Sequence, residues 1–263
     1  MNEKIMNKII KARNDFGIKN FPGNFFDLII KDENYISKYN LALFKQDLGK
    51  ESSGFISYAS NGIAYICINY KNNIGRQNFT LAHEIGHFYL HNGISQDDDD
   101  ESLKFGRKSD IIEAEANEFA AELLYPMDEV KKDVSYIYDN DLLDKEKYNE
   151  LADYVNDIAN KHFISFRFAM LRLLFNSEFA KNNSVVSKVE DTIQKVKPLG
   201  ERYEEKMHRF VKDNEYYKPY IGTLRIQEKI GKYLAEREEM GYDSVNAMID
   251  KSSELEGFDG TFI

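Results

Sequence analysis

Apolar residues recur every three or four positions at the start of the chain, and this period changes further along. Up to about Asp15 they alternate with lysines and other charged residues, which predicts a basic amphipathic helix. A mixed stretch follows to Lys50. Residues 54–59 and 63–69 are rich in Ile, Tyr and Phe, as strands are, and Asn61-Gly62 between them is a strong turn signal. The pattern therefore predicts a β-hairpin after the N-terminal helix.

The helical period returns after the hairpin. Thr80 is a candidate N-cap for a helix over residues 80–91, which Asn92-Gly93 would end. A second helix is expected over residues 110–125, where a proline stops it. Two further helices are expected near residues 143–161 and 164–178. The best candidate for a domain boundary follows at residues 182–184.

These elements predict an α+β fold with a small antiparallel sheet. We expect a first domain over residues 1–180 and a mostly helical C-terminal region of unassigned role over residues 181–263.

Composition narrows the function classes. The chain has 263 residues, 42% of them apolar, and a net charge of −10, which disfavours non-specific binding to nucleic acid. No apolar run is long enough to span a bilayer, and the charged N-terminus does not read as a secretion signal. The single cysteine, Cys67, excludes an internal disulfide. We therefore expect a cytoplasmic protein. The acidic run at residues 97–101 lacks calcium-loop spacing and is interpreted as a solvated loop.

The strongest chemical signal is His83-Glu84-Ile85-Gly86-His87, an H-E-x-x-H motif. Histidines at i and i+4 share one face of a helix, so both imidazoles can bind one zinc ion, and the glutamate beside them stays free to act as a base. Leu81, Ile85 and Phe88 lie on the opposite face, which indicates that one side of the helix is buried. Gly86 indicates close approach of another backbone or of a ligand.

Catalytic zinc normally has a third protein ligand. His91 lies a full turn beyond His87, too far along the helix to share the ion comfortably, and the position of a third metzincin histidine is occupied by Gly93. Cys67 could supply a thiolate, but it lies in an apolar strand, where a cysteine packs as a small hydrophobic residue.

The helix over residues 110–125 offers better candidates. Glu113 and Asn117 share a strip with small alanines, as close packing on the motif helix requires, so Glu113 is the predicted third ligand. The alternative is a capping box with Asp110 as N-cap. Asn117 could orient a ligand histidine, or simply pack between helices. The opposite strip, predicted to be solvated, holds Glu115, Glu118 and Glu122.

Two stretches carry a family resemblance. They are Ile66-Cys67-Ile68-Asn69 through Arg76-Gln77-Asn78-Phe79-Thr80-Leu81-Ala82-His83-Glu84-Ile85-Gly86-His87 to Leu90-His91, and Glu113-x-Glu115-Ala116-Asn117-x-Phe119-Ala120-Ala121-x-Leu123-Leu124-x-Pro126. Together they resemble the ImmA/IrrE family of zinc metallopeptidases, over residues from about 20 to 178. Tyr125 departs from the methionine that the family often has, and the tail after about residue 180 matches nothing.

The resemblance implies a zincin-like, gluzincin-type domain that binds one Zn²⁺ ion. His83, His87 and Glu113 are then the zinc ligands, and Glu84 is the catalytic acid and base. It also implies a protein substrate, namely a partner transcriptional repressor, often in mobile elements or stress responses. Direct nucleic-acid and membrane partners are not expected.

Several functional questions stay open at this level. A second donor for the oxyanion could be Tyr125, His162 or another tyrosine. An extended substrate could add as a strand to the hairpin edge. One rival function is helix-turn-helix DNA binding by residues 151–175, which hold only two arginines, Arg167 and Arg172. Another is a zinc-binding regulatory protein without turnover.

Overall fold

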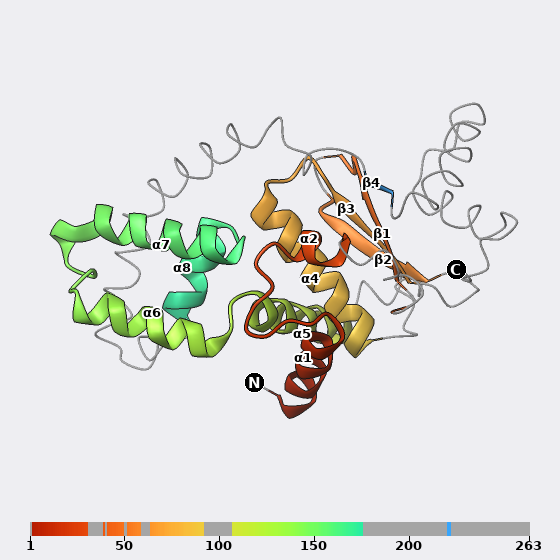
Figure 1. Ribbon diagram of the computed structural model, residues 1–263, viewed down its shortest axis with the longest axis horizontal. Helices are drawn as coiled ribbons and strands as arrows, with labels where there is room; N and C mark the ends of the chain where they lie inside the picture. The colour runs from red at the N-terminus through yellow and green to blue at the C-terminus, as the bar shows by residue number, and fades with distance from the viewer. Residues whose placement is uncertain are drawn as a thin grey trace, which may run out of the picture.

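The computed structural model describes residues 2–30, 39, 41–49, 52–58, 64–91, 107–175 and 220–221 (Figure 1). Its helices and strands are α1 (Glu3–Asp15), α2 (Phe25–Ile30), β1 (Leu41–Gln46), β2 (Gly54–Tyr58), β3 (Ala64–Asn69), α4 (Ile74–Leu90), α5 (Arg107–Leu124), α6 (Met127–Asp139), the 3-10 turn η2 (Lys145–Lys147), α7 (Tyr148–His162), α8 (Phe166–Phe175) and β4 (Tyr220–Ile221). The predicted acidic loop, the hairpin turn and, apart from β4, the predicted C-terminal region lie outside the described residues.

The strands form one mixed sheet in the order β2-β3-β1-β4. The predicted pairing of residues 54–59 with 63–69 is confirmed, because β2 and β3 are antiparallel and Tyr58 lies opposite Ala64. The purely antiparallel sheet is wrong, since β1 pairs with β3 in parallel. β1 is buried almost along its whole length and so lacks the alternation that marks a half-exposed strand. Its buried Lys45, which donates to Gln77 Oε1 at 2.7 Å, further obscured the strand.

The helices α4, α5 and α1 stack outward from the sheet (Figure 1). The predicted N-terminal helix is confirmed, and α1 buries Ile5, Ile9 and Ala12, which recur at helical spacing. α4 packs against β2 and β3 on one side and against α5 on the other. The H-E-x-x-H helix therefore lies between the sheet and α5.

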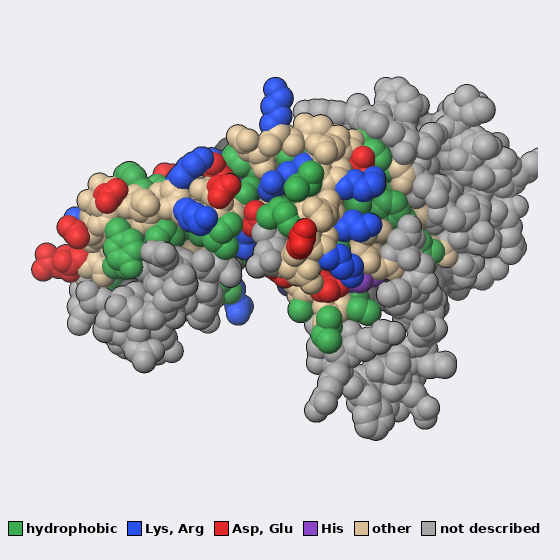
Figure 2. Space-filling model, turned by 90° about the horizontal axis from the view of Figure 1, so that it is seen from below, with side chains coloured by type: hydrophobic (Ala, Val, Ile, Leu, Met, Phe, Trp, Pro, Cys, Tyr) green, Lys and Arg blue, Asp and Glu red, His purple; other side chains and the backbone are tan. Residues whose placement is uncertain are grey.

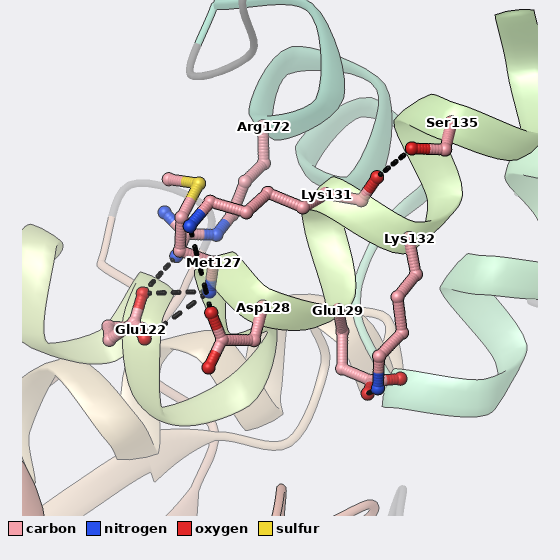
Figure 3. Close-up of polar contacts among 8 residues, drawn as sticks. All are labelled: Glu122, Met127, Asp128, Glu129, Lys131, Lys132, Ser135 and Arg172. Atoms are coloured by element: carbon pink, nitrogen blue, oxygen red, sulfur yellow. Dashed lines mark hydrogen bonds and ion pairs between the residues drawn. The ribbon is translucent and has the colours of Figure 1, made fainter.

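A lobe of three helices, α6, α7 and α8, continues from the end of α5 (Figure 1). The sequence predicted α7 and α8 but not α6, although α6 buries Val130, Val134 and Ile137 at helical spacing directly after Pro126. A buried ion pair joins the lobe to α5: Arg172 Nη2 lies 2.6 Å from Glu122 Oε2. The same carboxylate accepts the backbone N–H of Met127 at 3.0 Å (Figure 3). The prediction that Glu122 is solvated is therefore wrong.

One of the arginines behind the rival DNA-binding function is not available on the surface. Seen from below, lysine and arginine side chains lie among acidic and apolar ones in the described part of this face (Figure 2). Arg172, one of the two arginines of the suggested helix-turn-helix, is buried against Glu122. None of the helices in the described part of the chain combines the length and apolarity that crossing a membrane requires.

Candidate metal centre

α4 positions the two histidines of the motif. It begins at Ile74, six residues before the predicted N-cap Thr80, and its N-cap is Asn73, whose side chain accepts the backbone N–H of Arg76 at 2.8 Å. The first turns contain weak helix formers, so propensity alone reads them as a linker. Burial of Gln77 and Asn78, both hydrogen-bonded to neighbouring backbone, stabilises these turns in the folded chain.

Close packing of α5 on α4 brings Glu113 to the histidines. A Cβ atom on Gly86 would lie 3.2 Å from the carbonyl oxygen of Ala116 and 3.3 Å from its Cα atom. The prediction that Gly86 permits close approach of another backbone is thus confirmed. Without a side chain at this position the helix axes can approach closely enough for the Glu113 side chain to reach across the interface.

Three side chains converge at this contact. His83 Nε2 lies 3.0 Å from His87 Nε2, and the two nitrogens lie 3.1 and 3.4 Å from the carboxylate oxygens of Glu113. The potential ligand atoms of these three residues all lie within 4.8 Å of one another, close enough to hold one metal ion. His87 is buried, His83 is half-buried, and the Glu113 side chain is about half exposed.

The arrangement fits a tetrahedral metal ion. Zinc binds nitrogen and oxygen ligands at about 2.0–2.2 Å, so two ligands at tetrahedral corners lie about 3.3 Å apart, close to the three distances observed. Asn117 Oδ1 lies 3.0 Å from His83 Nδ1 and can accept its hydrogen. The Nε2 atom of His83 then presents a lone pair to Glu113 and His87, and a cation satisfies such a convergence of acceptors.

Electrostatics agree with a cationic occupant. Burial lowers the pKa of His83, but the carboxylates of Glu113 and Glu84 outweigh this and raise it overall. The contacts with the imidazoles of His83 and His87 hold the pKa of the Glu113 carboxyl far below its ordinary value. Glu113 is thus kept as a carboxylate, the form in which it can bind a metal.

Glu84 stands beside the three-residue cluster. Burial raises the pKa of its carboxyl to about 6, against the opposing effect of His83 and His87. It lines, with the cluster, a cleft of about 360 Å³. The other residues lining this cleft are Ser53, Gly54, Phe55, Arg76, Phe79, Thr80 and Asn117.

Other candidates from the sequence lie elsewhere. Cys67 is buried within β3, outside the cluster, and burial raises the pKa of its thiol to about 12. The capping-box alternative is wrong, because α5 begins at Arg107 and Asp110 is inside the helix. Neither suggested oxyanion donor lines the cleft: Tyr125 donates to Asp133, and His162 Nδ1 lies 2.9 Å from the carbonyl of Leu124.

The sequence prediction assigned no functional role to two polar residues that lie near the cluster. Arg76 lines the cleft, and its Nε donates to Ser53 Oγ at 2.8 Å. His91 was considered as a ligand and set aside, but its ring contacts His87. The continued i+4 row His83, His87 and His91 was the signal that could have indicated this contact.

Comparison with known proteins gives two matches. Residues 36–172, slightly more than half of the chain, match the IrrE N-terminal-like domain, Peptidase M78. Over 69 residues the chain is also 38% identical to an oligoendopeptidase F homolog of Borreliella burgdorferi. That second match covers 25% of this chain and 11% of the relative, so it spans only a small part of the relative's length.

Proposed function

Because this chain belongs to the M78 peptidase family with an IrrE N-terminal-like domain, we propose that it is a zinc-dependent endopeptidase. We assign His83, His87 and Glu113 as ligands of one zinc ion and Glu84 as the catalytic acid and base. The observation that carries this proposal is the convergence of two imidazole nitrogens and one carboxylate at the spacing of a tetrahedral site.

Glu84 is suited to move a proton. When bound, zinc supplies a Lewis acid that polarises a peptide carbonyl and lowers the pKa of water. Glu84 is carried by the same helix as both histidines and lines the same cleft, and a carboxyl with a pKa near 6 accepts and returns a proton readily around neutral pH. Its side chain takes the proton of the attacking water and then delivers it to the leaving amine.

The proposed substrate is a protein bound in an extended conformation. Among the described strands β2 lies at an edge of the sheet, and its residues Gly54 and Phe55 line the cleft. An extended segment that adds to this edge brings a peptide bond to the metal centre. The family resemblance favours a partner transcriptional repressor as the natural substrate and the cytoplasm as the compartment, where a buried free thiol such as Cys67 stays reduced.

The direct test combines metal analysis with cleavage. We expect about one zinc per wild-type chain, and loss of zinc from His83→Ala and Glu113→Ala. Glu118→Ala, which removes a carboxylate from the same helix outside the cluster, should keep the metal.

Glu84→Gln separates catalysis from binding. The variant should retain zinc and lose cleavage of a randomised peptide library followed by mass spectrometry. Wild type that binds zinc but cleaves no peptide or repressor would favour the regulatory alternative without turnover, and cleavage retained by Glu84→Gln would reject the role of Glu84.

A further inference from the structure

A line of polar side chains leads from the candidate metal centre toward the outer helices. His91, the C-cap of α4, is 6% exposed, and its Nδ1 lies 3.1 Å from Nδ1 of His87. On its other side, Nε2 of His91 lies 3.0 Å from Glu115 Oε2. The same oxygen of Glu115 lies 3.7 Å from Nζ of Lys4, in α1. The line therefore connects α4, α5 and α1.

The chemistry of these groups orders the hydrogens along the line. An ionised carboxylate only accepts, so the hydrogen between Glu115 and His91 belongs to Nε2 of His91. A neutral imidazole has one N–H, which leaves a lone pair on Nδ1 of His91. The hydrogen between the two rings then belongs to Nδ1 of His87. As a result, Nε2 of His87 carries a lone pair directed at His83 and Glu113, as a metal ligand requires.

We propose that His91 and Glu115 are positioning residues that hold His87 in its metal-binding tautomer and ring orientation. This inference rests on the proposed function, because it concerns the same metal centre. His91 accepts the Nδ1 hydrogen of His87 just as Asn117 accepts that of His83. Asn117 Oδ1 lies 3.0 Å from Nδ1 of His83. α5 thus supplies a ligand, Glu113, and two acceptors that orient the histidine ligands from outside the metal site.

The two histidine ligands are oriented in different ways, and this difference explains why His91 is needed. Asn117 of α5 contacts His83 directly, whereas Glu115 of α5 acts on His87 only through the imidazole of His91, which lies on the same helix as His87. His91 is nearly fully buried, so a hydrogen bond to water is a poor substitute for the one it makes with Glu115. Loss of either residue leaves Nδ1 of His87 or Nε2 of His91 without its partner.

The first test measures zinc affinity of the full chain by competition with a chromophoric chelator. His91→Phe, which keeps a ring but no nitrogen, and Glu115→Ala should each bind zinc about 10 to 100 times more weakly than wild type. Glu115→Gln, which retains an acceptor oxygen, should recover most of the affinity. Lys4→Gln removes only the 3.7 Å ion pair and serves as the matched control, with affinity within about twofold of wild type.

The second test measures the tautomer of His87, which a merely structural role of His91 or Glu115 would not change. In the zinc-free chain with ¹⁵N-labelled histidine, long-range ¹H–¹⁵N spectra at neutral pH should show the hydrogen of His87 on Nδ1 in wild type. The two tautomers should mix in Glu115→Ala. A hydrogen on Nε2 of His87 in wild type, or unchanged zinc affinity in both His91→Phe and Glu115→Ala, overturns the inference. Absence of zinc binding by wild type instead overturns the proposed function.

Discussion

Burial is the largest influence on the pKa of His162. It lies fully buried between Phe21 and Tyr125, and its Nε2 makes no hydrogen bond within the described part of the chain. Burial lowers the pKa of its imidazole to about 4, although the hydrogen bond with Leu124 opposes the shift. The folded chain therefore holds His162 neutral at a pH where the unfolded chain protonates it.

This difference predicts a loss of stability in mild acid. Because the unfolded state binds the proton more tightly, the free energy of unfolding falls as pH drops below about 6.5, and the loss is complete near pH 4. The contribution at pH 5 is about 2 kcal/mol relative to pH 8. Urea unfolding measures the free energy of unfolding at pH 8 and at pH 5. The difference between the two pH values should be about 2 kcal/mol smaller in His162→Gln than in wild type. An equal pH dependence in the two proteins would contradict the assignment.

Arg76 is the cationic residue among the described side chains that line the cleft. Its Nε is held by Ser53, which orients the guanidinium at the cleft. A hydrogen bond from a charged donor contributes about 1.5–3 kcal/mol, so Arg76→Met should lower kcat/KM for a cleaved peptide about 10 to 100 times. Zinc content should be unchanged. Arg167→Met, an exposed arginine of α8 that does not line the cleft, is the control; equal effects of both substitutions would contradict a role in the cleft.

Sequence reasoning placed the cluster well at the residue scale. The i, i+4 spacing and the helical phase of α5 predicted that His83, His87 and Glu113 converge, and they do. It misplaced Glu122, because phase shows which residues share a face and not what packs on that face. The partner of Glu122 is Arg172, 50 residues away, a contact that no local pattern specifies.

At the scale of elements, local signals sufficed where one period was clean. The amphipathic α1 and the antiparallel pair β2 and β3 were predicted from spacing and turn chemistry. β1 was missed because a buried parallel strand lacks alternation, and its parallel pairing with β3 is a long-range contact. The early start of α4 was missed because tertiary burial outweighs the low helix propensity of its first turns.

The joint between α5 and the α6–α8 lobe predicts a large local effect on stability. Glu122 is a buried carboxylate that pairs with Arg172 and caps α6 at Met127 (Figure 3). Removing one partner of a buried pair leaves an uncompensated charge, so Glu122→Ala should lower the free energy of unfolding by about 3–5 kcal/mol. Lys131→Ala breaks an exposed pair with Asp128 and should change it by less than about 1 kcal/mol. Chemical denaturation measures the free energy of unfolding of both variants. Similar small effects would contradict a stabilising role for the buried pair of Glu122 and Arg172.

At the scale of the whole molecule, the proposed metal would join α4 and α5, which are separated along the chain by residues 91–106. The ligands come from α4 and α5, and α4 in turn packs on the sheet. A ligand that binds only the folded state stabilises it by about 2.7 kcal/mol when its free concentration is 100 times Kd. Metal binding is therefore expected to act on the global stability.

Removal of metal should accordingly lower the melting temperature. For a chain of this size the stabilisation corresponds to a Tm difference of about 5–10 °C between zinc-loaded and chelator-treated protein. His83→Ala, which lacks a ligand, should melt at the same temperature with and without chelator. A Tm that is independent of chelator in wild type would show that zinc does not bind preferentially to the folded chain.

The most direct measurement is anomalous diffraction at the zinc edge from crystals of the chain purified without added metal. The metal-centre assignment predicts a single peak about 2.0–2.2 Å from Nε2 of His83, Nε2 of His87 and an oxygen of Glu113, with the Glu84 carboxylate beyond bonding distance. A crystal without a peak in this cleft, or a peak whose third protein ligand is not Glu113, would contradict the proposed metal centre.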